Sequence, residues 1–83
     1  MTEKPTVTLF TRKGCHLCER AKEVIEKLHQ STDFIYEEHD INEKDEWTEN
    51  YGLMIPVVLI DGKEIQFGQI DRSTLVRELS KQK

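Results

Sequence analysis

Two cysteines three residues apart, Cys15 and Cys18, are the side chains of this chain best suited to covalent chemistry. They are the only cysteines in 83 residues, and they lie where an apolar, strand-like run at 7–11 gives way to a helical pattern. A helix N-terminus offers unpaired N–H groups and the positive end of the helix dipole, and both stabilise a thiolate relative to a thiol. Because the thiolate reacts in disulfide exchange, this placement predicts Cys15 as the attacking nucleophile and Cys18 as the resolving partner.

The patterns on both sides of the pair predict the elements that position it. Residues 6–11 are typical of a strand, and a tight turn at 12–14 leads into a helix that continues to about residue 30. A second strand is expected at 34–39. The predicted apolar face of the first helix consists of Leu17, Ala21, Val24, Ile25 and Leu28.

Residues 42–51 are predicted to form a short helix. Asn42 is a good N-cap, acidic residues fill the first turn, and Gly52 is well placed to end the helix. Trp47 and Tyr51 lie four residues apart, and we expect them to pack against the core rather than to bind a substrate.

The remaining residues predict a hairpin and a last helix. The apolar run at 55–60 is typical of a central strand that Pro56 begins, and Asp61-Gly62 favours a tight hairpin back through residues 63–67. Asp71 is expected to cap the last helix, with Ile70 and Leu75 spaced as a hydrophobic staple. The predicted apolar face of this helix is Leu75, Val76 and Leu79.

The resulting order, β-α-β-α-β-β-α, predicts an α/β fold in one domain spanning residues 1–83. The first β-α-β should be a right-handed crossover between parallel strands, and the hairpin should add antiparallel strands to give a mixed four-stranded sheet. A Cys-x-x-Cys pair beside a β-α-β pattern is a thioredoxin-like redox motif.

Charge and composition exclude several classes of function. The net charge of -4 argues against nucleic acid and against anionic membrane as partners. No apolar run approaches the ~20 residues that span a bilayer, and the polar N-terminus does not resemble a secretion signal. Two neighbouring cysteines do not make a secreted disulfide scaffold, so we expect the protein to work in a reducing cytoplasm. We also expect it to be a monomer.

The chain resembles the thioredoxin superfamily, and within it the small bacterial glutaredoxin-like proteins of poorly assigned function. The resemblance is carried by Thr-Arg-Lys-Gly-Cys-His-Leu-Cys at 11–18, by Asp-Ile-Asn at 40–42 with Tyr-Gly-Leu at 51–53, and by Ile-Pro-Val at 55–57 with Asp-Gly-Lys at 61–63. It extends from residue 7 to about 79. It implies a glutaredoxin-type thioredoxin fold and thiol-disulfide exchange with disulfide-containing proteins or with glutathione, supported by a thiol reductant as electron donor.

The resemblance also assigns roles to individual residues. Cys15 matches the attacking cysteine and Cys18 the resolving one, while Pro56 matches the family's cis-proline. Ile55 is then expected to offer a free backbone to an extended substrate. Arg12 matches a basic residue that assists glutathione binding, and Gly68 matches part of the glycine segment that cradles the γ-glutamyl end of glutathione.

Other positions depart from the family or remain open. His16 and Leu17 stand where glutaredoxins usually carry proline and tyrosine, and the glycine segment is interrupted after Gly68. Glutathione is therefore predicted as a weak co-substrate, with no bound cofactor. Lys13, His16 and Asp71 are candidate modulators, although His16 fits a surface residue equally well and Asp71 fits a plain helix cap.

Three alternatives to a redox enzyme remain at this point. The cysteine pair could be half of a structural zinc site, although the three histidines are not spaced as a second ligand pair and no metal site is predicted. A metallochaperone of the heavy-metal-associated type also places Cys-x-x-Cys between a first strand and a first helix, but in the order β-α-β-β-α-β. The third alternative is a redox-inactive domain that keeps the fold for interactions.

Overall fold

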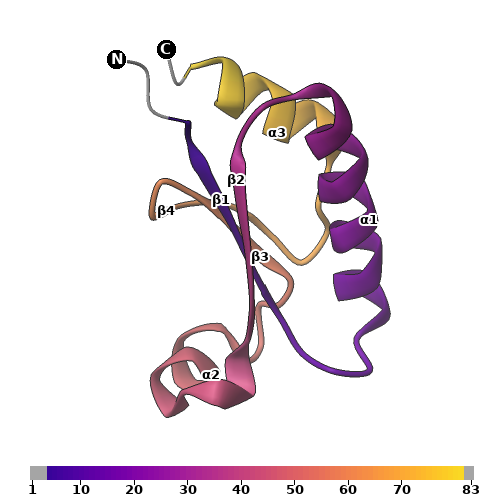
Figure 1. Cartoon of the computed structure of the whole chain (residues 1–83). Coiled ribbons are helices and arrows are strands. Elements are labelled where there is room, and N and C mark those ends of the chain that lie inside the picture. Colours follow the sequence, from indigo (N-terminus) through magenta and orange to yellow (C-terminus); the bar gives the residue numbers. More distant parts are fainter. Residues whose placement is uncertain (1–3, 82–83) are drawn as a thin grey trace.

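The elements follow the predicted order in a computed structural model, which describes residues 4–81. They are β1 (Thr6–Thr11), α1 (His16–Ser31), β2 (Ile35–Asp40), the 3₁₀ turn η1 (Ile41–Glu43), α2 (Asp45–Tyr51), β3 (Val57–Ile60), β4 (Lys63–Phe67) and α3 (Arg72–Ser80). Figure 1 shows α1 and α3 on one side of the strands and α2 at one end of the other side. No helix among the described residues is long and apolar enough to cross a membrane.

The sheet is mixed and four-stranded, in the order β2-β1-β3-β4. β1 pairs with β2 in parallel, whereas β1 with β3 and β3 with β4 are antiparallel. This is the predicted fold class, and it is not the β-α-β-β-α-β order of a heavy-metal-associated domain. The Asp61-Gly62 hairpin is confirmed, and both residues have positive φ, 52° and 82°, as a tight two-residue turn requires.

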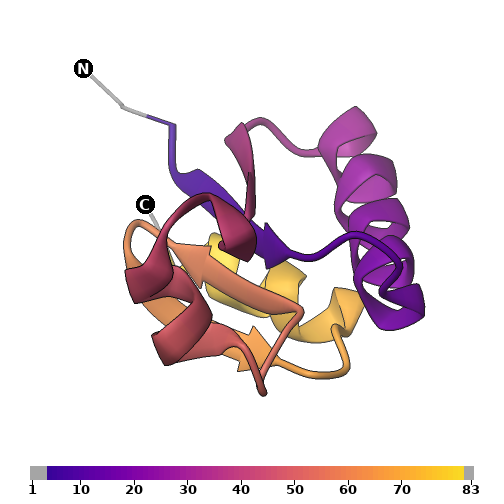
Figure 2. The same ribbon diagram turned by 90° about the horizontal axis from the view of Figure 1, so that it is seen from below.

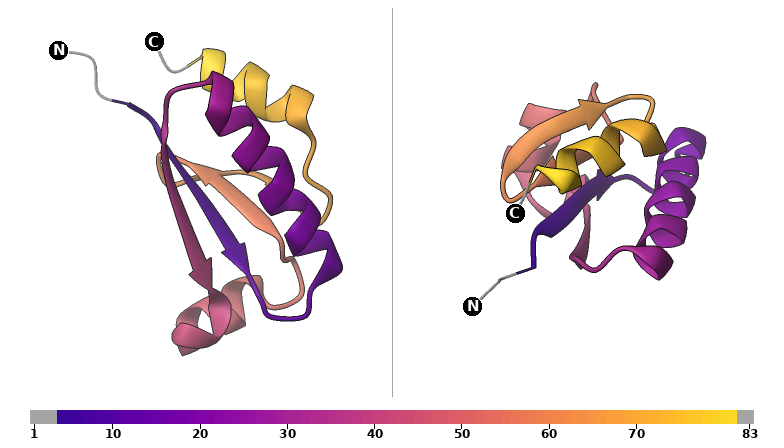
Figure 3. Two further views of the ribbon diagram at one scale, coloured as in Figure 1. Left: turned by 45° about the vertical axis from the view of Figure 1, so that its right-hand side comes forward. Right: turned by 90° about the horizontal axis from the view of Figure 1, so that it is seen from above.

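The larger part of the core lies between the sheet and the pair α1 and α3, which lie together on one face (Figure 3). This cluster contains Val7, Leu9, Ala21, Ile25, Leu28, Phe34, Val58, Ile60, Leu75 and Leu79. Val57 and Leu59 of β3 alternate to the other face, where Trp47 and Tyr51 of α2 pack against them and Phe10. Figure 2 shows α2 and α1 on opposite sides of the strands.

Three details of the predicted helices are wrong. Leu17 and Val76 are 49% and 41% exposed, because the buried faces are formed by Cys18 with Ala21 and by Leu75 with Leu79. Asn42 is not an N-cap. The Asp40 carboxylate instead accepts from the Asn42 N–H at 2.8 Å and starts η1, so α2 begins only at Asp45.

Candidate functional site

The turn from β1 into α1 presents Cys15 at the helix N-terminus. The Cys15 N–H donates to the Arg12 carbonyl at 3.3 Å, and Gly14 takes the positive φ (79°) that this turn requires. Cys15 is the N-cap of α1, and its Sγ accepts a hydrogen bond from the Cys18 N–H at 3.2 Å. The Cys18 N–H and the positive end of the α1 dipole therefore both face the Cys15 sulfur.

The two sulfurs differ in access. Cys15 is half-buried, whereas Cys18 is only 3% exposed, and both are free thiols. Burial, followed by the hydrogen bond with Cys15, raises the pKa of Cys18 to about 12, although a backbone hydrogen bond from Arg12 partly opposes this. The arrangement therefore has one accessible sulfur that can attack a disulfide and one shielded sulfur that can act only on its neighbour.

Charged side chains surround an open cleft of about 410 Å³ beside the cysteine pair. The bases Arg12 and Lys13 lie on its rim, together with acids from α1, β2 and η1. The cleft is lined by Thr11, Arg12, Lys13, Gly14, Cys18, Glu19, Glu38, Asp40 and Glu43. Arg12 and Lys13 thus line the same cleft as Cys18, in a setting with more acids than bases.

His16, the other candidate modulator near the pair, faces solvent. Its side chain is 97% exposed, and its Nδ1 lies 4.0 Å from a Glu19 carboxylate oxygen. This geometry favours the surface-residue interpretation of His16. The ring of His39, in contrast, lies 4.9 Å from that of Trp47 and 5.8 Å from that of Phe10, in the packing around α2.

The loop before β3 carries a buried Pro56, and the Ile55–Pro56 peptide bond is cis, as the resemblance implies. The expected free backbone of Ile55 is wrong in one respect. Its N–H donates to the Tyr51 carbonyl at 3.1 Å, because the chain leaving α2 continues as a tight turn. Only the Ile55 carbonyl is left to pair with an added strand.

Gly68 also departs from its expected role. Its N–H donates to the Pro56 and Met54 carbonyls, at 2.8 and 3.1 Å, so it holds the proline loop in place instead of facing a substrate anion. The Gln69 and Asp71 N–H groups donate to the Phe67 carbonyl and to Gln66 Oε1. The Asp71 carboxylate caps α3 by accepting from the Thr74 N–H at 3.2 Å, which confirms the cap.

Sequence reasoning missed two groups that shape this site. One is the Tyr51 carbonyl, which no sequence pattern marks. The other is Glu38, which lies in the cleft beside Cys18. Glu38 could have been found from the strand alternation, because Tyr36 and Glu38 share a face and α1 packs against that face.

The family follows from a comparison with known proteins. A model described as "Glutaredoxin-like domain (DUF836)" matches residues 6–80. The chain belongs to this family. A glutaredoxin-like protein of Dictyostelium discoideum is 34% identical over 79 residues, which cover 88% of this chain and 73% of that protein.

Solved structures share the fold of this glutaredoxin-like chain. The protein Ne2328 of Nitrosomonas europaea has a TM-score of 0.80 at 24% identity, covering 94% of each chain. A mutant thioredoxin of Halobacterium salinarum has a TM-score of 0.74 at 21% identity, covering 96% of this chain and 75% of that one. The chain is thus a glutaredoxin-like, thioredoxin-fold domain whose Cys15-x-x-Cys18 pair is consistent with redox function at the level of the family.

Proposed function

We propose that this protein is a dithiol thiol-disulfide oxidoreductase that acts on protein disulfides, with glutathione as a weak co-substrate. The observation that carries the proposal is the asymmetry of the cysteine pair. Cys15 is only half-buried and its Sγ accepts the Cys18 N–H at 3.2 Å, while Cys18 is 3% exposed.

The chemistry follows from this asymmetry. The Cys15 thiolate attacks one sulfur of a substrate disulfide and releases the other as a thiolate, leaving a mixed disulfide at Cys15. Cys18 then attacks Cys15 Sγ and releases the second substrate sulfur. The substrate gains two electrons, the cysteine pair becomes a disulfide, and a thiol reductant returns the pair to its reduced form.

The weak use of glutathione is supported by hydrogen bonds that the protein makes within itself. The Gly68 N–H, which the resemblance assigns to the γ-glutamyl end of glutathione, and the Ile55 N–H, which it assigns to an extended substrate, both donate to backbone carbonyls of this chain. Each charge-assisted hydrogen bond lost to the γ-glutamyl end costs ~1.5–3 kcal/mol, roughly tenfold to a hundredfold in affinity. Arg12 remains available for the glycyl carboxylate.

The deciding experiment sets reduction of insulin disulfides beside a Cu(I) titration with a competing chelator. We expect catalysed insulin reduction that the Cys15→Ser variant loses. Tight Cu(I) binding without insulin reduction would instead support a metallochaperone. A protein that showed neither insulin reduction nor tight Cu(I) binding would support the redox-inactive interaction domain.

A second experiment tests the dithiol mechanism. The Cys18→Ser variant should accumulate a mixed disulfide at Cys15, detected by mass spectrometry, and should lose turnover. If this variant kept full activity on a glutathionylated substrate, the mechanism would be monothiol and centred on glutathione. That result would contradict the proposed preference for protein disulfides over glutathione.

A further inference from the structure

The resolving step poses a problem of proton transfer. Cys18 carries a proton in the resting site, since burial raises the pKa of its thiol. The sulfur must lose that proton as it attacks Cys15 Sγ, because the thiolate is the nucleophile. The described core contains no buried polar or charged side chain that could take it. An acceptor therefore has to lie where Cys18 meets the cleft.

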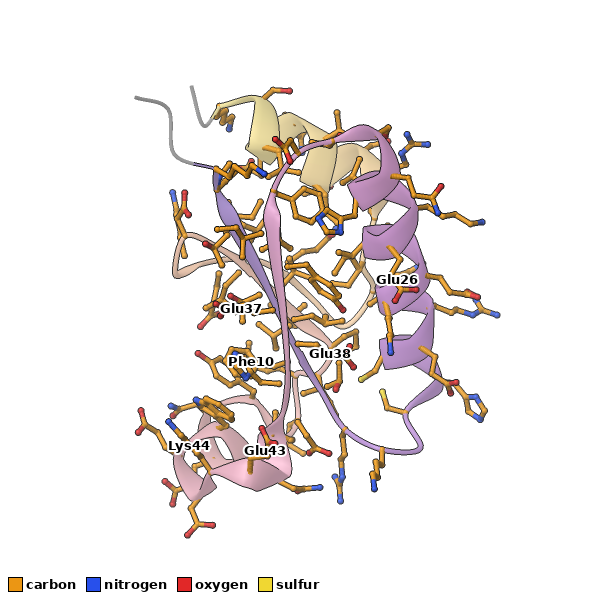
Figure 4. The ribbon with its side chains drawn as sticks, viewed as in Figure 1. Phe10, Glu26, Glu37, Glu38, Glu43 and Lys44 are labelled. Carbon is orange, nitrogen blue, oxygen red and sulfur yellow. The ribbon has the colours of Figure 1, made fainter. Side chains whose placement is uncertain are left out.

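Glu38 occupies the wall of that cleft opposite α1. Figure 4 shows Glu38 on the side of β2 that faces α1 and Glu37 on the other side. Glu38 and Cys18 both line the cleft, so the carboxylate and the shielded cysteine border the same open space. Glu38 also pairs in register with Leu9 on β1, a buried residue that offers no titratable group of its own.

Two neighbours hold the Glu38 carboxylate in place. Lys22 Nζ of α1 lies 3.4 Å from Glu38 Oε1, and the Tyr36 hydroxyl donates to the same oxygen at 3.4 Å. Burial, followed by the charge of Glu38, raises the pKa of Tyr36, so this hydroxyl stays protonated and remains a donor. Both contacts are with Oε1 of a carboxylate that lines the cleft, and a carboxylate has a second oxygen that can accept a proton.

We propose that Glu38 accepts the Cys18 proton, directly or through water in the cleft, during resolution of the mixed disulfide. This inference rests on the proposed dithiol function. As the S–H bond of Cys18 breaks, its sulfur forms a bond to Cys15 Sγ and the bond from Cys15 to the substrate sulfur breaks. The proton passes to the Glu38 carboxylate and then, through solvent, to the departing thiolate. Atoms and charge balance without another reactant.

Glu19 is the rival acceptor, because it lines the same cleft and its charge contributes to the raised pKa of Cys18. It is held less firmly than Glu38. Its side chain is 75% exposed, and its contact is with His16 at 4.0 Å, whereas Glu38 is 36% exposed and fixed by Lys22 and Tyr36. The other titratable groups around Glu38 are Glu26 of α1, Asp40 of β2, Glu43 of η1, and Arg12 and Lys13 of the turn before α1.

The sign of the effect separates proton acceptance from simple electrostatics. Removal of a negative charge near a thiol favours the thiolate, so a Glu38 that acted only through its field would make E38Q resolve faster. A lost proton acceptor makes E38Q resolve slower. The two roles predict opposite changes in one rate constant.

The experiment mixes the reduced full-length protein with one equivalent of 5,5′-dithiobis(2-nitrobenzoate) in a stopped-flow instrument. Attack by Cys15 releases one thionitrobenzoate in a second-order phase, and resolution by Cys18 releases the other in a first-order phase. C18S, which cannot resolve, identifies the phases. The matched control is E37Q, which removes the same charge from the neighbouring residue on the opposite face of β2.

We expect E38Q to slow the second phase at least about tenfold near neutral pH and to leave the first phase within twofold of wild type. The deficit should shrink as the pH rises toward the pKa of Cys18, where the thiol ionises without help. E37Q should match wild type in both phases. E38A should regain second-phase rate in added formate, which keeps the test valid if E38Q folds poorly.

Two results would overturn the inference while the proposed function stands: a second phase in E38Q as fast as or faster than that of wild type, or one slowed equally by E37Q. A wild-type protein that releases no second thionitrobenzoate would instead defeat the dithiol function itself.

Discussion

The N-terminus of α1 and the N-terminus of α3 offer the same physical opportunity, and the chain uses them in opposite ways. Each presents unpaired N–H groups and the positive end of a helix dipole. At α1 the N-cap is Cys15, a reactive group, and the Cys18 N–H points at its sulfur. At α3 the N-cap is Asp71, whose carboxylate neutralises the helix end within the protein.

The loops that lead into the two helices continue this contrast. The turn before α1 leaves Arg12 and Lys13 in an open cleft. In the loop before α3, the Gly68 N–H donates to the Pro56 carbonyl and the Asp71 N–H donates to Gln66 Oε1. The comparison teaches that a glycine-bearing loop at a helix N-terminus is an anion site only while its donors remain free.

The largest effect is expected when Cys15, the reactive N-cap of α1, is replaced. Cys15→Ser keeps a good N-cap residue but replaces the thiol by a hydroxyl that does not exchange with disulfides. We expect insulin reduction to fall on the order of a thousandfold or more while the thermal midpoint changes little. Activity within tenfold of wild type in Cys15→Ser would place the chemistry elsewhere.

A matched pair of glycines tests whether the two loops differ in function but not in strain. Gly14 and Gly68 both have φ of 79°, and neither would bring an added Cβ within 4 Å of another group. Each substitution to alanine should therefore cost about 1–2 kcal/mol in the free energy of unfolding, measured in urea. Gly14→Ala also moves Cys15, so we expect it to lose roughly tenfold in insulin reduction beyond Gly68→Ala. Equal activity in the two variants would contradict the contrast.

The sequence predicts the fold well because its signals are local and agree with one another. Apolar runs, the Asp61-Gly62 turn and the cap at Asp71 each specify one element, and the order of elements restricts the topology. The buried faces of α1 and α3 are harder to predict. Leu17 and Val76 continue the apolar spacing but are 49% and 41% exposed, because each lies beside the buried face of its helix rather than on it.

The site was predictable only in its covalent part. Cys15 and Cys18 are marked by type and spacing, whereas the fate of each backbone N–H depends on contacts that no pattern encodes. The Ile55 N–H meets the Tyr51 carbonyl because α2 ends directly before the proline loop. The Gly68 N–H meets the Pro56 carbonyl one position beyond the Val57–Phe67 pair of the β3–β4 hairpin, in a register that depends on an irregularity between Val58 and Leu59.

The buried Cys18 should make the free energy of unfolding depend on pH in the alkaline range. The native state holds the Cys18 proton more tightly than the unfolded chain, because the pKa rises from 9.0 to about 12. Its contribution to stability is fully present below pH 9 and is lost as the pH rises toward 12, at roughly 1 kcal/mol per pH unit. Chemical unfolding of the reduced protein between pH 8 and 11 measures this slope. Cys18→Ala should show a shallower slope, and an identical slope in both proteins would contradict the assigned burial.

The smallest effect is expected at the closed helix end. Asp71→Ala removes the carboxylate that accepts from the Thr74 N–H at 3.2 Å and from the Thr74 hydroxyl at 3.0 Å. Loss of this cap should lower the free energy of unfolding by about 1 kcal/mol. Turnover of a glutathionylated substrate should stay within about twofold, because this carboxylate is engaged by α3 rather than by a substrate amine. Asp71→Asn keeps a capping oxygen without the charge, so it should restore most of the stability. If both variants instead lost glutathione turnover about tenfold while retaining insulin reduction, Asp71 would be a glutathione ligand, and the end of α3 would be an open binding site after all.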